Sequence, residues 1–212
     1  MQIDSNGRVA GSLGGTQVSF NGVLAPLYYA AENQINVLVP YEVAASTKVN
    51  MTIATSTGSS QTLPLQVAAA QPNIMAVLNS DGSVNSSSHP ASPGDKLTIL
   101  VSGAGLLNPQ LTDGTIAPSP APLPAASVQV DFHFTLFAFC LVDCPPDIGI
   151  GTLTATPAYA GASPDTVINM LLVNVQVPAN LYSDGPPPFG VAIRVGNSTS
   201  PTLQFYLAAP SN

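Results

Sequence analysis

Turn-forming residues interrupt this sequence at short intervals, and they constrain the fold more than any other feature. The 212 residues include 21 prolines and 17 glycines. Proline lacks the backbone N–H that regular structure needs, and glycine favours turns. Between these breaks we find no long apolar stripe with the 3.6-residue period of a helix. Short strands separated by turns are typical of β-sandwiches, so we predict an all-β fold with few helices.

One sequence pattern occurs twice and predicts two domains. It reads APLYYAAENQINVLVPYEV at residues 25–43 and TPAYAGASPDTVINMLLVNVQVPANL at residues 156–181. Each copy opens with Pro-x-Tyr and closes an apolar run with Asn-Val-x-Val-Pro. Repetition at this scale indicates tandem domains. We predict two immunoglobulin-like β-sandwiches, at residues 1–72 and 73–212, the first of which lacks its initial strands.

Three segments carry a resemblance to a known family. They are LGGTQVSFNGVLAPLYYAAENQINVLVPYEV (13–43), AVLNSDGSVNSSSHPASPGDKLTILVSGAG (76–105) and YAGASPDTVINMLLVNVQVP (159–178). They resemble the Solibacter-type C-terminal tandem domain of secreted Acidobacterial proteins, whose halves look like IPT/TIG folds. The resemblance implies an exported protein without a known activity or catalytic residues. The chain departs from the family in an insertion at about residues 131–153 and in a late N-terminal start.

The insertion contains both cysteines of the chain, Cys140 and Cys144. We predict that they close a small disulfide turn, which favours an oxidising compartment. A metal site would need two further ligands, and the chain offers only His89 and His133 as histidines. A redox site would prefer Cys-x-x-Cys spacing. Together with the family resemblance, the disulfide leads us to expect an extracellular or cell-surface protein.

The insertion is also the candidate interface with another protein. Its first part alternates apolar and polar residues, and its second part is apolar on both faces, so something must cover it. It can fold back onto its own domain, or it can dock on another subunit or on another part of a larger parent protein. The residues that we assign to this interface are Phe132, Phe134, Leu136, Phe137, Phe139 and Leu141.

The composition argues against several classes of function. Only four basic residues stand against eleven acidic ones, and the net charge of −7 disfavours nucleic acids and anionic membrane surfaces. The longest apolar run is too short to span a membrane. Neither histidine lies in a catalytic motif, and Asp81 is the only acid in the calcium-like run at residues 79–85. We therefore predict no enzyme, no cofactor and no metal, and we assign a turn to Asp81-Gly82.

These observations predict a non-enzymatic structural module that associates with itself or with a parent protein. The short first domain should leave a groove, to be filled by residues 1–12, by an upstream segment or by a neighbour's strand. Such pairing would make the chain a subunit of a surface assembly or filament. The alternatives are a passive stalk of a larger secreted protein and a carbohydrate- or protein-binding adhesion module, although the chain has no tryptophan for a sugar platform.

Overall fold

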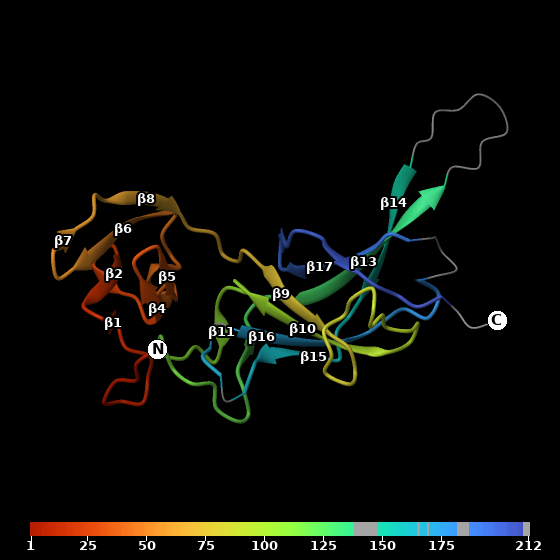
Figure 1. Ribbon diagram of the computed structural model, residues 1–212, viewed down its shortest axis with the longest axis horizontal. Helices are drawn as coiled ribbons and strands as arrows, with labels where there is room; N and C mark the ends of the chain where they lie inside the picture. Colours follow the sequence, from red (N-terminus) through yellow and green to blue (C-terminus); the bar gives the residue numbers. More distant parts are fainter. Residues whose placement is uncertain (138–147, 165, 169, 182–186, 210–212) are drawn as a thin grey trace. The chain divides into compact units, whose positions relative to one another are not determined.

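The protein is all-β, as predicted, and its strands form several sheets (Figure 1). The computed structural model describes all residues except 138–147, 165, 169, 182–186 and 210–212. The chain divides into two compact units. Unit 1 contains Met1–Ala70, Gly105–Ala125 and Ala162–Met170, and unit 2 contains Gln71–Ala104, Ala126–Gly161 and Leu171–Asn212.

The main sheet of unit 1 is antiparallel and is built from short strands. Its order is β1 (Ser12–Leu13), β2 (Thr16–Phe20), β6 (Lys48–Thr55) and β7 (Gly58–Ser59), with β3 (Val23–Leu24) beside β2 and β8 (Leu63–Gln66) beside β6. A turn at Asn21-Gly22 joins β2 to β3, and both turn residues have positive φ angles, of 51° and 84°. Asparagine followed by glycine tolerates this conformation better than other residue pairs.

A two-stranded ribbon packs against this sheet. It consists of β4 (Leu27–Ala31) and β5 (Gln34–Val37), and the 3-10 turn η1 (Tyr41–Val43) follows it. β3 and β4 are separated at Pro26, which cannot donate to a ladder. Sheet, ribbon and η1 share a core of Val18, Phe20, Ala25, Leu27, Val43 and Val49.

Two later segments of the chain complete unit 1. They contain the strand pair β11 (Leu107–Asn108) and β12 (Leu123–Pro124) and supply a second core of Leu107, Ala117, Ala162 and Ile168. Leu38 and Tyr41 pack against this core. We expected two continuous domains with a boundary between residues 72 and 73. The observed units differ, because each contains segments from both sides of that boundary. The segment 105–125 is proline-rich and has no strand periodicity, so its sequence is typical of a connection. Its packing against distant residues cannot be predicted from the local pattern.

The N-terminal residues also lie within unit 1, which bears on the predicted groove. Leu27 N on β4 donates to Ala10 O over 2.9 Å, and Val9 N donates to Gly114 O over 2.9 Å. Residues 1–12, one of the expected occupants, therefore lie beside the ribbon. The segment 105–125, which the sequence did not indicate, joins them there.

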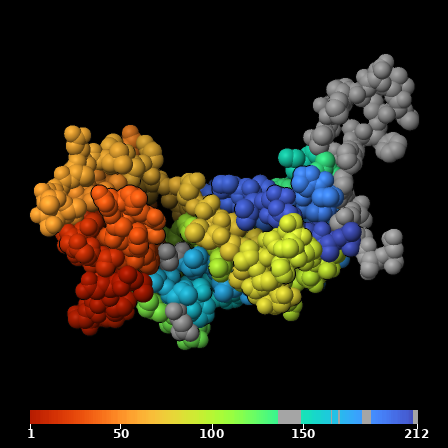
Figure 2. Space-filling model, viewed as in Figure 1, coloured from red at the N-terminus to blue at the C-terminus, as the bar shows by residue number. Residues whose placement is uncertain are grey.

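Unit 2 contains two larger sheets. One has the order β15 (Tyr159–Ala162), β16 (Met170–Gln176), β10 (Lys96–Ser102) and β9 (Asn73–Leu78). The other has the order β14 (Ile148–Ala155), β13 (Val128–Phe137), β17 (Phe189–Val195) and β18 (Ser198–Thr199), with β19 (Leu203–Phe205) beside β17. The loop between β9 and β10 forms a continuous part of the unit 2 surface (yellow-green in Figure 2).

Alternating side chains build the core of unit 2. β10 buries every second residue, namely Leu97, Ile99 and Val101. Val130, Phe132 and Phe134 of β13 are buried, and β17 is buried at every residue except Arg194. Phe132 and Phe205 meet edge to face, with their ring centroids 5.8 Å apart. One buried face on each sheet is compatible with a β-sandwich. The two copies of the sequence repeat form similar structures. The first copy contains the neighbouring strands β4 and β5, and the second contains the neighbouring strands β15 and β16.

We expect Phe132→Ala to destabilise the protein by about 3–5 kcal/mol, because it removes a fully buried ring and leaves a cavity. Chemical denaturation measures this loss as a lower midpoint at unchanged slope. The control is Leu203→Ala on β19, where the side chain is 40% exposed and a smaller loss is expected. Equal effects of the two substitutions would contradict the assignment of Phe132 to the core.

Candidate functional site

The six residues predicted for an interface do not lie together in one place. Phe132 and Phe134 are buried in unit 2 and contribute to its core. Leu136 and Phe137 are the last two residues of β13. Phe139 and Leu141 lie outside the described residues, as do Cys140 and Cys144 with their predicted disulfide. The interface prediction therefore rests on the other four residues, which are Leu136, Phe137, Phe139 and Leu141. The disulfide stays a prediction.

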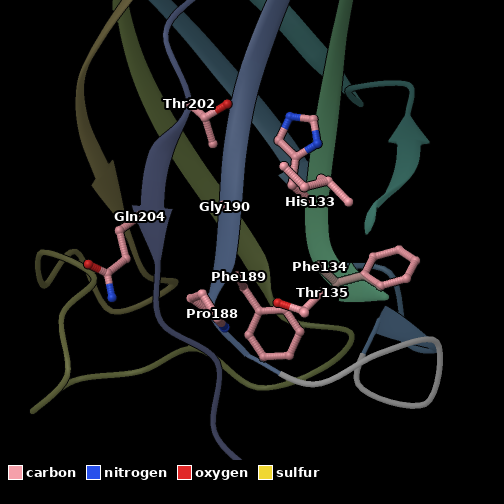
Figure 3. Close-up of a pocket in the computed structure, with 9 residues that line it drawn as sticks. His133, Phe134, Thr135, Pro188, Phe189, Gly190, Thr202 and Gln204 are labelled. Atoms are coloured by element: carbon pink, nitrogen blue, oxygen red, sulfur yellow. The ribbon is translucent and has the colours of Figure 1, made fainter. Parts of the chain in front are cut away.

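A depression of about 370 Å³ lies on the β13 sheet (Figure 3). It is lined by His133, Phe134, Thr135, Ile150, Pro188, Phe189, Gly190, Thr202 and Gln204. Gly190 forms its floor, because a Cβ there would approach Thr202 Cγ2 to 2.5 Å. His133 is the titratable side chain in this lining, and its Nδ1 lies 2.9 Å from Thr152 Oγ1. Among the described residues, none that lines the depression carries a carboxylate that could pair with His133 for acid–base chemistry.

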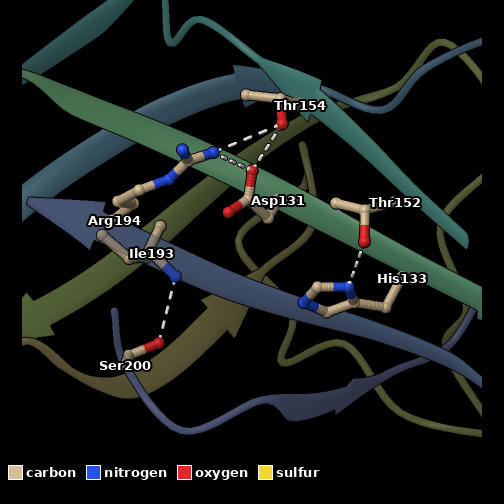
Figure 4. A network of polar contacts seen from close by, with 7 residues as sticks. All are labelled: Asp131, His133, Thr152, Thr154, Ile193, Arg194 and Ser200. Carbon is tan, nitrogen blue, oxygen red and sulfur yellow. Dashed lines mark hydrogen bonds and ion pairs between the residues drawn. The ribbon is translucent and has the colours of Figure 1, made fainter. Parts of the chain in front are cut away.

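Next to the depression, an ion pair between β17 and β13 is joined by a threonine of β14 (Figure 4). Arg194 on β17 donates through Nη2 to Asp131 Oδ1 on β13 over 2.7 Å, and Thr154 Oγ1 on β14 donates to the same oxygen over 2.6 Å. Asp131 is buried, and the side chain of Arg194 is 37% exposed. The pair compensates the charge of Asp131, so its function is structural. Strand register brings these residues together across 63 positions, and for that reason the sequence did not indicate the pair.

The outer edge of β14 is the most distinctive feature of this sheet. β14 pairs with β13 along all eight of its residues, from Ile148 opposite Phe137 to Ala155 opposite Val130. It then ends the sheet, and no strand in the described part of the chain pairs with its other side. Its sequence IGIGTLTA contains no charge and no proline, and Ile150 is 75% exposed. Proteins normally protect such edges with charges, prolines or covering loops.

The other strands that end a sheet in the described residues are shorter or protected. β1, β7 and β18 have two residues each, and β8 contains Pro64. β9 has six residues, but Asn85 N donates to Val77 O over 2.9 Å, so the following loop covers part of it. On β4, Leu27 N donates to Ala10 O, so the N-terminal segment covers part of that strand. β14 is therefore the longest edge among the described strands, and it carries none of these protections.

The turn prediction for Asp81-Gly82 is confirmed. Asp81 Oδ1 accepts hydrogen bonds from the hydroxyl and the backbone N–H of Ser83, at 2.7 and 2.9 Å. These bonds hold the pKa of Asp81 below its usual range. Gly82 has a φ of +83°. Within the described residues, no group of three or more His, Cys, Asp or Glu side chains is arranged to hold a metal ion.

Comparisons with known proteins gave no relative. No family model matches the chain, and no match was found among curated proteins or solved structures. Within the described residues, no helix is long and apolar enough to cross a membrane. The function is therefore argued from the chain's own geometry.

We expect Asp131→Ala to lower the free energy of unfolding by about 1–3 kcal/mol, because it removes the acceptor shared by Arg194 and Thr154. The partly exposed Arg194 can turn to solvent, which keeps the loss in this range. Gln129→Ala on the same strand face is the control and should change stability by less than about 0.5 kcal/mol. Urea denaturation of both variants measures these losses. Equal losses of unfolding free energy would show that the ion pair does not stabilise the fold more than an ordinary surface residue does.

Proposed function

We propose that the protein is a non-enzymatic assembly module and that its unprotected β14 edge pairs with β14 of a second copy. The observation that carries the proposal is an eight-residue, uncharged edge strand without a covering segment in the described residues. Every second residue of such a strand directs its N–H and C=O groups away from its own sheet. An added strand can bond to these groups, which is a common mode of protein association.

A second copy is a suitable partner for this edge. A two-fold contact requires a surface that complements itself. β14 meets this requirement, because two antiparallel copies of IGIGTLTA place no like charges opposite one another. The side chain of Ile150 is three-quarters exposed in the single chain and would lose water in the pair. Burial of apolar surface favours association.

Net charge opposes this association at long range. The chain carries a formal charge of −7, so two copies repel one another as they approach. Salt screens such repulsion over a Debye length of about 8 Å at 0.15 M. The proposed pairing should therefore strengthen as the salt concentration rises. A contact made by ion pairs would weaken under the same conditions.

The proposal includes the finer architecture and the location of the protein. We propose that the units are immunoglobulin-like sandwiches of the IPT/TIG type and that the protein works outside the cell or on its surface. The two sheets of unit 2 and their alternating burial support the first part. The second part follows from the family resemblance and from the predicted disulfide of Cys140 and Cys144. Larger assemblies or filaments would need a second contact, for which the apolar residues after Phe134 are the candidates.

Light scattering after size-exclusion chromatography tests the proposed pairing. Wild-type protein should move with rising concentration toward twice the 21.6 kDa of one chain. Ile150→Lys adds a charge beside the edge and should weaken the pairing by about tenfold or more, which corresponds to about 1.4 kcal/mol. Val84→Lys makes the same change at an exposed residue in the β9–β10 loop and should leave the mass unchanged.

Two outcomes would contradict self-pairing. A wild-type mass of one chain at every concentration and salt level would favour the passive stalk. Equal loss of association in the Val84→Lys and Ile150→Lys variants would show that net charge, and not the edge of β14, controls the contact.

A further inference from the structure

A hydrogen bond at the end of β17 fixes the direction of the backbone groups throughout its sheet. Gly196 N donates to Ser127 O over 2.9 Å, one step beyond the pair Val128–Val195 of the β13–β17 ladder. Opposite residues in an antiparallel ladder exchange both hydrogen bonds or none, and the two kinds alternate. Both ladders of β13 run without a shift in register. Ser127 and every second residue after it therefore bond to β17, and the residues between them bond to β14.

A second hydrogen bond agrees with this assignment. Val130 is one of the residues that bond to β14, and it lies opposite Ile193 of β17. The backbone groups of Ile193 should therefore point away from β13. Ile193 O accepts Ser200 N over 2.9 Å, on the side of β17 that faces away from β13. Two separate contacts thus give the same alternation.

The alternation identifies the open backbone groups of β14. Gly149, Gly151, Leu153 and Ala155 lie opposite the residues of β13 that bond to β14. Their N–H and C=O groups are therefore used within the sheet. The other residues of β14 direct these groups to the open edge, and they are Ile148, Ile150, Thr152 and Thr154. We call these four the outward residues.

The side chains along this edge leave room for a second strand. Thr152 and Thr154 bond through their hydroxyl groups to side chains of β13, so both are held over their own sheet (Figure 4). Gly151 has no side chain, and a Cβ there would clash with the ring of Phe134. The middle of the edge is therefore flat. Glycine within a strand is typical of places where another backbone approaches closely.

We propose that two copies pair with Ile150 opposite Thr152 of the second copy, so that the two-fold axis passes between the two Gly151 residues. This inference rests on the pairing of β14 proposed above and specifies its register. All outward residues are paired in this register, because Ile148 then lies opposite Thr154. A shift by two residues leaves one outward residue of each copy opposite no residue of β14. A shift by one residue places outward residues opposite residues that bond to β13.

The side chains that meet in this register are compatible. In an antiparallel pair, the opposite residues that exchange no hydrogen bonds come closest, with Cα atoms about 4.5 Å apart. In the proposed register these positions pair Gly151 with Gly151 and Leu153 with Gly149. No two large side chains meet there, so the strands can approach fully. The hydrogen-bonded positions pair isoleucine with threonine, and both residue types favour strands.

Disulfide trapping tests the register. Opposite residues that exchange hydrogen bonds have Cα atoms about 5.5 Å apart, which a disulfide can bridge. An equimolar mixture of Ile150→Cys and Thr152→Cys should form a covalent dimer under mild oxidation, with a yield about tenfold or more above that of either variant alone. In either variant alone, the two new thiols lie on a diagonal of about 7–8 Å, which is too long.

The control mixture is Val84→Cys with Thr152→Cys, which should give no such dimer because Val84 is exposed in the β9–β10 loop. Peptide mapping by mass spectrometry separates these links from any made by Cys140 and Cys144. A link in Ile150→Cys alone would place Ile150 opposite itself, and a link in Thr152→Cys alone would place Thr152 opposite itself. Either result would overturn the proposed register.

Hydrogen exchange of the wild-type protein keeps the test decisive if the variants do not fold or associate. Association should raise the protection of all four outward amides by about tenfold or more. The amides of Gly151 and Leu153 bond to β13 and should stay protected in dilute and concentrated protein. A gain at only some outward amides would overturn the register and leave the pairing of β14 intact. Protein that never associates, or that associates without a gain at β14, would overturn the pairing and the register together.

Discussion

Backbone hydrogen bonding at the edges of sheets is the constraint on which the structure depends. The chain is built from short strands, and each edge strand presents N–H and C=O groups that need a partner or water. Most edges are shortened, broken by proline or covered, as Asn85 covers β9 and Ala10 covers β4. Among the described strands, β14 is the exception, and the function that we propose follows from that exception.

The same constraint explains why unit 1 is discontinuous in the sequence. Its first 70 residues form a small sheet and a ribbon, whose buried core of six residues is modest. The segments 105–125 and 162–170 add a second core and satisfy backbone groups such as Val9 N.

Local patterns predicted local structure well and long-range structure poorly. Alternation indicated the strand that became β13, and Asp81-Gly82 indicated a turn, because each signal lies within a few residues. The return of residues 105–125 to unit 1 was missed, because it depends on packing against Leu38 and Tyr41 far away in the chain. Asp113 lies in a proline-rich segment that reads as a connection, so the hydrogen bond that it accepts from Tyr41 N could not be foreseen. The candidate interface was too broad, because Phe132 and Phe134 alternate into the core of their own sheet.

Hydrogen exchange along β14 is the most direct test of the central claim, which is that this edge is open in one chain and closed by a second. In dilute protein, the alternate β14 amides that point away from β13 should exchange as fast as unprotected amides. In concentrated protein at high salt, these amides should become protected, while those that bond to β13 stay protected throughout. Protection of both sets at every concentration would contradict the account, because the edge would then be covered within the single chain.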